Sequence, residues 1–205
     1  MHPSTGRLLL GLAALLWLAG CVGGGRSPQT EFYSLSSLSE QGEVKEGATQ
    51  ALPGAVGVGP ISFPDYADRP QIVARTSDNR VKVEEFHRWA GSVKQDFSRV
   101  LVENLSLLLG SDRVFVFPWR GAVPVARRVT VDVARFDGVP GGQSTLVAHW
   151  AVIDEQGGKV LHTERTRLQQ ATQAHGYSGV AATLSHLTAE LSRKIAVRLA
   201  QEPEK

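Results

Sequence analysis

Cys21 is the only cysteine among the 205 residues, and it directly follows the small residues Ala19 and Gly20. A lone cysteine supports no internal disulfide and no cysteine-based metal cluster, so its chemistry lies in the attachment of another group. Residues 8–17 are almost wholly apolar and follow Arg7, which is typical of a signal peptide. Because a helix needs about 20 apolar residues to cross a bilayer, this shorter run favours cleavage over a retained anchor.

The order Leu18-Ala19-Gly20-Cys21 resembles the lipoprotein box of bacterial signal peptides. This resemblance implies cleavage between Gly20 and Cys21, a diacylglycerol on the Cys21 thiol and an N-acyl chain on the new amino terminus. No other cofactor is expected. Each buried methylene contributes about 0.8 kcal/mol, so two or three such chains would hold the protein firmly on a membrane. The alternatives are an ordinary secretory signal with an incidental cysteine and a buried core thiol.

The chain divides by composition into three parts. Residues 1–20 are expected to be a cleaved signal peptide, residues 21–30 a lipidated flexible leash rich in Gly, Ser and Pro, and residues 31–205 a single periplasmic domain. With 42% hydrophobic residues, the domain can bury a core without disulfides or metals. Loss of Arg7 with the signal peptide lowers the net charge from +2 to +1, which argues against a nucleic-acid partner.

Three motifs that could carry catalysis or metal binding lack the rest of their signatures. Gly176-Tyr177-Ser178-Gly179 places its second glycine one position too early for a nucleophile elbow, so Ser178 is expected to cap a helix. His162 and Glu164 would share one face of a strand, but no further ligands accompany them. The glycines of residues 54–59 match neither phosphate-binding fingerprint and are expected to serve close backbone packing. We therefore expect no catalytic residue and no metal site.

Hydrophobic periodicity predicts amphipathic helices over residues 92–109 and 178–201. Ser92 with Gln95 indicates a capping box, and Gly110 suits the end of the first helix. Strand candidates cover residues 32–35, 55–63, 114–117, 125–136, 145–153 and 159–168, together with a hairpin of residues 71–76 and 80–86. The stretch from residue 36 to about residue 50 is expected to be an exposed polar loop. The expected fold class is α+β, with a mostly antiparallel sheet of six to seven strands and both helices packed on one face.

A polar turn over residues 64–70 begins and ends with proline and contains Tyr66 and Arg69. The two prolines stiffen the turn, which lowers the ordering cost of binding it to another surface. We therefore predict Tyr66 and Arg69 as partner-binding residues, on a loop that contributes little to the core. Trp89 is predicted to pack in the core at a strand-to-helix corner. For Tyr66, Trp89 and Trp119 the two alternatives are the edge of the core and an exposed binding anchor.

Several short motifs stand in a fixed order along the mature chain: Phe32-Tyr33-Ser34-Leu35, Val58-Gly59-Pro60-Ile61, Arg69-Pro70-Gln71-Ile72-Val73, Glu85-Phe86-His87-Arg88-Trp89-Ala90, Leu101-Val102-Glu103-Asn104-Leu105 and Gly176-Tyr177. No single motif is specific, but their order resembles the auxiliary lipoproteins of ABC-type transport systems, the PqiC family. Relatives usually carry a proline just after Trp-Ala, where this chain has Gly91. We expect Ser92 to preserve the helix start in its place.

This resemblance implies a periplasm-facing lipoprotein that works with an MCE-domain protein and an inner-membrane transport subunit to move lipids between two membranes. We therefore expect a non-enzymatic docking subunit that supports envelope integrity and contacts outer-membrane phospholipid. Val22 is not the aspartate that retains lipoproteins in the inner membrane of enteric bacteria, so the inner leaflet of the outer membrane is expected. The alternative is a lipid-binding carrier, in which the sheet and the helix over residues 93–108 enclose an apolar pocket. Assembly into a homo-oligomer stays open.

Overall fold

The computed structural model describes residues 28–42, 54–119, 124–172 and 176–201, which form two β-sheets and two α-helices. The predicted cleavage site at Gly20 and Cys21 lies outside these residues, as does most of the predicted leash. No helix among the described ranges is both long and apolar enough to cross a membrane.

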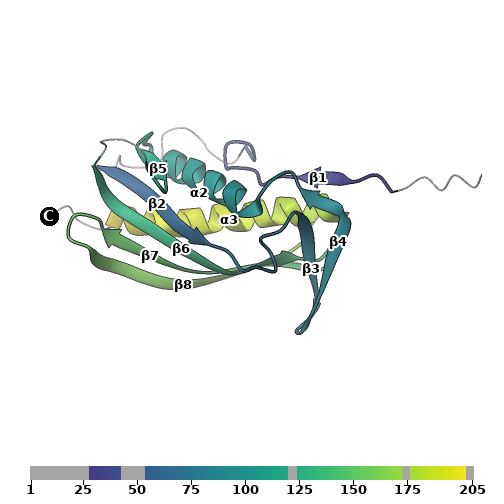
Figure 1. The fold of residues 1–205 in the computed structure, drawn as a ribbon. Helices are drawn as coiled ribbons and strands as arrows, with labels where there is room; N and C mark the ends of the chain where they lie inside the picture. The colour runs from purple at the N-terminus through teal and green to yellow at the C-terminus, as the bar shows by residue number, and fades with distance from the viewer. Residues whose placement is uncertain (1–27, 43–53, 120–123, 173–175, 202–205) are drawn as a thin grey trace, which may run out of the picture.

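The larger sheet has five strands in the order β5-β2-β6-β7-β8 (Figure 1). Their bounds are β5 Val114–Val116, β2 Ala55–Ser62, β6 Val125–Gly138, β7 Gln143–Asp154 and β8 Lys159–Ala171. β6, β7 and β8 form the predicted antiparallel meander, which is confirmed. β2 is parallel to both of its neighbours, β5 and β6.

The smaller sheet has three strands in the order β1-β4-β3. Their bounds are β1 Glu31–Tyr33, β4 Arg80–Trp89 and β3 Gln71–Ser77. β3 and β4 form the predicted hairpin, which is confirmed, and β1 adds to β4 in parallel. In Figure 1 this sheet lies at the opposite end of the molecule from the carboxyl end of α3 (Gly176–Gln201).

The α+β class and the two helices are confirmed, but the expected sheet is wrong in two respects. There are eight strands among the described residues rather than six or seven, and they form two mixed sheets rather than one mostly antiparallel sheet. Alternating side chains show which face of a strand is buried, but they do not show its partner or the direction of pairing. The parallel pairs join strands that are connected by long crossovers, such as the hairpin and helix between β2 and β5.

α2 (Val93–Leu109) begins and ends as the sequence predicts. The backbone N–H of Gln95 donates to the Ser92 hydroxyl at 3.3 Å, and Gly110 adopts a left-handed conformation with φ of 57°. Ser92 therefore caps the helix, as predicted. α3 (Gly176–Gln201) begins two residues before Ser178, so Ser178 lies inside the first turn and the prediction that it caps the helix is wrong.

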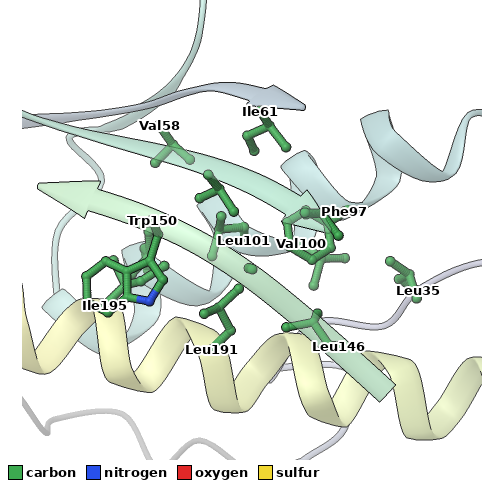
Figure 2. Packing of buried hydrophobic residues seen from close by; sticks show 14 of the residues in the cluster. Leu35, Val58, Ile61, Phe97, Val100, Leu101, Leu146, Trp150, Leu191 and Ile195 are labelled. Carbon is green, nitrogen blue, oxygen red and sulfur yellow. The ribbon is translucent and has the colours of Figure 1, made fainter. Parts of the chain in front are cut away.

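Both helices pack on one face of the five-stranded sheet, and the core lies between them and the strands (Figures 1 and 2). Figure 2 shows Leu101 of α2 and Leu191 of α3 near Leu146 and Trp150 of β7. All four side chains are almost completely buried. This apolar layer also contains Trp89, 6% exposed, so the prediction that Trp89 lies in the core is confirmed.

The segment that follows β1 packs against α2 instead of forming an exposed loop. Ser37 and Leu38 are buried, which contradicts the expectation that the stretch from residue 36 is exposed. The backbone N–H of Leu35 donates to Asp96 Oδ2 at 2.6 Å, and that of Leu38 donates to Asn104 Oδ1 at 2.7 Å. The polar composition of the stretch did not indicate that the backbone N–H of Leu38 finds its partner on a distant helix.

Candidate functional site

An apolar groove runs between the outer side of α2 and the strands β2 and β5. It has a volume of about 700 Å³ and a mainly apolar lining. Residues 58–61 of β2 form one wall, Val116 and Phe117 form the lip, and α2 forms the opposite wall. A recess of this volume and lining suits an apolar small molecule.

α2 lines the groove with two neighbouring stripes of side chains, each spaced by four residues as a helix requires. The first stripe consists of Lys94, Ser98 and Val102, and the second consists of Gln95, Arg99 and Glu103. The second stripe lies opposite the buried positions of the helix, so the polar side predicted from the sequence forms the rim of the groove.

Glycines in β2 allow two aromatic side chains to approach the strand closely. Gly59 has a φ of 126°, and a Cβ on it would lie 2.6 Å from Cβ of Phe117. A Cβ on Gly57 would lie 2.5 Å from the ring of Trp119, which stacks edge-on against Phe117 with ring centres 5.4 Å apart. The prediction that these glycines serve close backbone packing is therefore confirmed. Trp119 is half-buried at the edge of the sheet, not fully exposed.

The two cations on the α2 wall, Arg99 and Lys94, differ in whether a carboxylate lies close enough to form an ion pair. Arg99 Nη2 lies 2.8 Å from Asp96 Oδ1, and Arg99 Nη1 lies 3.2 Å from Glu103 Oε2. The hydrogen bond that Arg99 donates to Asp96 is the main reason that the pKa of Arg99 is raised. Lys94, by contrast, has no carboxylate within 4.0 Å among the described residues. The groove thus combines an apolar interior with one uncompensated positive charge at its rim.

The groove carries no pair of side chains suited to acid–base or nucleophilic catalysis. Its lining contains no histidine or cysteine among the described residues, and its only carboxylate, Glu103, is paired with Arg99 and accepts hydrogen bonds from Ser37 and Ser39. The Ser98 hydroxyl donates to the Lys94 carbonyl within the helix at 2.7 Å.

Tyr66, one of the two predicted partner-binding residues, belongs to a buried polar cluster. Its hydroxyl donates to Asp137 Oδ2 at 3.0 Å and accepts from the backbone N–H of Phe136 at 3.4 Å. The guanidinium of Arg75 lies 5.3 Å from the centre of its ring. Burial, followed by the charge of Asp137, raises the pKa of Tyr66. The expectation that this loop contributes little to the packed interior is therefore wrong for Tyr66.

Asp137 is the centre of this cluster, and its side chain is only 1% exposed. Arg75 Nε approaches it at 3.3 Å, and Arg135 Nη2 approaches it at 2.9 Å. The cluster joins β6 to the β3–β4 hairpin and to the turn that contains Tyr66, because buried charge requires partners. Arg69 stands outside the cluster on the exposed side of the turn. The structure thus separates the two predicted residues into one that is half-buried and one that is free to meet a partner.

His162 and Glu164 share one face of β8, as predicted, with His162 Nε2 3.5 Å from Glu164 Oε2. The imidazole lies against Trp150 with ring centres 5.1 Å apart, and Glu164 accepts from the Thr166 hydroxyl at 2.8 Å. The Thr166 hydrogen bond is the main reason that the pKa of Glu164 is lowered. In the part of the chain that the structure describes, no group of three potential ligands could hold a metal ion.

One cluster brings together motifs that sequence reasoning treated separately. The Tyr33 hydroxyl of β1 lies 2.9 Å from His87 Nδ1 of β4, and the His87 ring lies 4.3 Å from that of Tyr177 at the start of α3. These residues are 54 and 90 positions apart in the chain, so no local pattern predicts their contact. Each of the three is an aromatic residue of a different motif among those that carry the family resemblance.

Comparisons with known proteins agree with this fold. A crystal structure described as an uncharacterized protein is 21% identical, covers 84% of this chain and 99% of its own, and superimposes with a TM-score of 0.68. Protein XCC0632 from Xanthomonas campestris is 13% identical, covers 83% of this chain and 95% of its own, and has a TM-score of 0.69. No curated protein sequence matches this chain.

The family model described as the ABC-type transport auxiliary lipoprotein component matches residues 33–196. The matched region begins at Tyr33 in β1, includes the hairpin, α2 and the meander, and ends inside α3. Because it covers well over half of the chain, the protein belongs to the ABC-type transport auxiliary lipoprotein family.

Proposed function

We propose that the protein is a non-enzymatic, membrane-anchored subunit of an intermembrane lipid transport system, and that it docks an MCE-domain partner at the outer membrane. The observation that carries this proposal is the family match over residues 33–196, directly preceded in the chain by a leash and a lipoprotein box. An inner-membrane transport subunit completes the system. Such a link between the two membranes supports envelope integrity.

Cys21 is the proposed lipidation site, with Gly20 before the cleaved bond and Val22 directing the mature protein to the outer membrane. The acyl chains would lie in the inner leaflet, with residues 31–205 facing the periplasm. Membrane fractionation of the wild type and of Cys21→Ala tests this: we expect the wild type in the outer-membrane fraction and the variant to be lost from it. Identical partitioning of the two proteins would contradict the anchor.

Partner docking is assigned to the turn that contains Tyr66 and Arg69. Arg69 is exposed and the surrounding turn is fixed by hydrogen bonds, the N–H groups of Ala67 and Asp68 both donating to the Pro64 carbonyl at 2.9 and 3.0 Å. A fixed turn loses little conformational entropy when it binds. Arginine is enriched among residues that dominate binding energy in interfaces.

Arg69→Ala therefore tests docking better than any change at Tyr66, whose loss would also disturb Asp137. We expect Arg69→Ala to reduce co-purification of the MCE-domain partner and to leave the melting temperature unchanged. The matched control is Arg80→Ala, which removes an exposed arginine at the tip of the β3–β4 hairpin. Full-strength binding by Arg69→Ala, or an equal loss in both variants, would contradict a specific role for this turn.

The groove favours a second candidate function, a lipid-binding carrier. An acyl chain would occupy the apolar interior between α2 and β2, and a phosphate at the rim would meet the uncompensated ammonium of Lys94. Native mass spectrometry of the detergent-purified lipoprotein should then show a stoichiometric phospholipid. We expect Ser98→Trp to expel it, because Ser98 lines the groove, and Ser106→Trp on the same helix to retain it. A wild-type protein without bound phospholipid would contradict the carrier function and leave docking as the remaining candidate.

A further inference from the structure

Two phenylalanines are exposed on the three-stranded sheet. Their exposed apolar surface does not contribute to the stability of the fold. Phe32 of β1 is 64% exposed and Phe86 of β4 is 44% exposed. Scattered single apolar residues are common on protein surfaces, but two aromatic rings on neighbouring strands indicate a contact surface.

Register and exposure together place both rings on the same face of the sheet. Phe32 shares a face with Arg88, its register partner. β4 has a register irregularity between Glu84 and Arg88, so Phe86 is placed by its own exposure and by the next residue, His87, whose ring contacts Tyr177 on the opposite, covered side. Tyr33 and its register partner Trp89 point to the opposite side, where Trp89 is buried. We call the first side, defined by Phe32, Phe86 and Arg88, the outer aromatic face.

This face is held near the proposed lipid anchor by the length of the chain. Phe32 lies eleven positions after Cys21 in the chain. An extended chain spans at most about 3.3–3.6 Å per residue, so Phe32 lies within about 40 Å of Cys21 whatever path the chain takes. The carboxyl end of α3 lies at the other end of the molecule (Figure 1). Of the two ends, the one with the outer aromatic face is the one that the anchor keeps beside the bilayer.

We propose that the outer aromatic face is a membrane-contact surface that rests on the phospholipid bilayer, an inference that depends on the lipid anchoring at Cys21 proposed above. Aromatic side chains partition into the headgroup region of a bilayer, where the ring is removed from water. The guanidinium of Arg88 suits the phosphate oxygens of the headgroups. Because the anchor already holds the domain at the surface, a weak contact is enough to fix its orientation.

A single thiol tests this contact in the full lipoprotein. Cys21 is the only cysteine, and its sulfur is blocked when it carries diacylglycerol, so Phe32→Cys introduces the only reactive thiol. The matched control is Val160→Cys, because Val160 is an apolar residue of an edge strand with similar exposure, 55%, on the other sheet. Each variant is labelled with a polarity-sensitive fluorophore and reconstituted into phosphatidylethanolamine and phosphatidylglycerol vesicles that contain nitroxide-labelled lipid.

We expect the probe at residue 32 to shift its emission to the blue and to be quenched by the nitroxide lipid, and the probe at residue 160 to do neither. Phe86→Cys should behave like Phe32→Cys, and it serves as the readout if Phe32→Cys melts at a lower temperature than the wild type. Equal and weak quenching at residues 32, 86 and 160 would overturn the inference. The inference would also be overturned if the thiol at residue 32 cross-linked to a second copy or to the MCE-domain partner, and its probe were not quenched by the nitroxide lipid. The face would then contact a protein and not the bilayer.

The same samples separate failure of this inference from failure of the anchor. Wild-type protein that reacts with the thiol reagent would show that Cys21 is free, which overturns the proposed lipidation and, with it, this inference. Wild-type protein that does not react, together with an unquenched probe at residue 32, overturns the membrane contact and leaves the anchor standing.

Discussion

Asn104 is the buried polar residue on which the packing of three segments depends. It is fully buried on α2, where its Oδ1 accepts from the Leu38 N–H at 2.7 Å and its Nδ2 donates to the Ser192 hydroxyl of α3 at 3.2 Å. The Ser192 hydroxyl in turn donates to the Thr188 carbonyl at 2.8 Å. One amide therefore satisfies the backbone of the segment after β1 and also links the two helices.

Replacement by leucine keeps the number and branching of the side-chain heavy atoms and removes both hydrogen bonds. The N–H of Leu38 would then remain buried without a partner, which costs about 1–3 kcal/mol of the free energy of unfolding. For a domain of this size, each kcal/mol lowers the melting temperature by about 2–4 °C, so we expect Asn104→Leu to melt about 2–12 °C lower.

Thermal unfolding followed by circular dichroism measures this effect on the wild type and Asn104→Leu. Gln95→Leu is the matched control, since it removes an exposed amide from the same helix and should change stability by no more than about 0.5 kcal/mol. A melting temperature of Asn104→Leu equal to or above that of the wild type would refute the reasoning that the Leu38 backbone depends on this amide.

Three further predictions concern the core and the tyrosines. Gly57→Ala should lose about 1–3 kcal/mol in urea unfolding, because its Cβ would press on the Trp119 ring, whereas Gly91→Ala has open space and should be neutral. Trp89→Ala should lose about 3–5 kcal/mol in the same assay, as expected for a buried aromatic residue. All three tyrosines have a raised pKa, that of Tyr33 reaching about 12 through burial and then Glu31, so tyrosinate absorbance should appear only above pH 10 in the folded protein. A raised pKa stabilises the fold below the unfolded value of 10.0, so stability should fall as pH rises from there towards 12.

Features set by local sequence were predictable. The ends of α2 follow from Ser92 and Gly110, each of which acts on the backbone within one turn of itself. The β6–β7–β8 meander follows from alternation interrupted by short turns. The apolar recess expected between the sheet and the helix over residues 93–108 is present as the groove, because the positions that line it lie on faces that periodicity defines.

Features that depend on distant residues were not predictable. Tyr66 was interpreted as a free binding residue because its neighbours are polar, yet its hydroxyl finds Asp137, which is 71 positions away. Asp137 is buried near the end of β6, 62 positions after Arg75, and no spacing rule indicates that the two side chains will meet. Parallel pairing of β2 with β5 and β6 belongs to the same class, because it is decided by where long connections return.

Lipid anchoring at Cys21 and lipid binding in the groove, both proposed above, are compatible functions. A second recess shares Gln95 and Arg99 with the groove and continues past the first turn of α2 to Ser34, the residue that directly follows β1. The Ala90 N–H donates to the Tyr33 carbonyl at 2.7 Å, so this recess is fixed against β1 itself. A bilayer that rests on the outer aromatic face would therefore contact the strand that borders this second recess. If the carrier function holds, phospholipid should load into the groove faster from vesicles to which the protein is anchored than from free lipid at the same concentration, whereas a pure docking subunit would show no loading from either source.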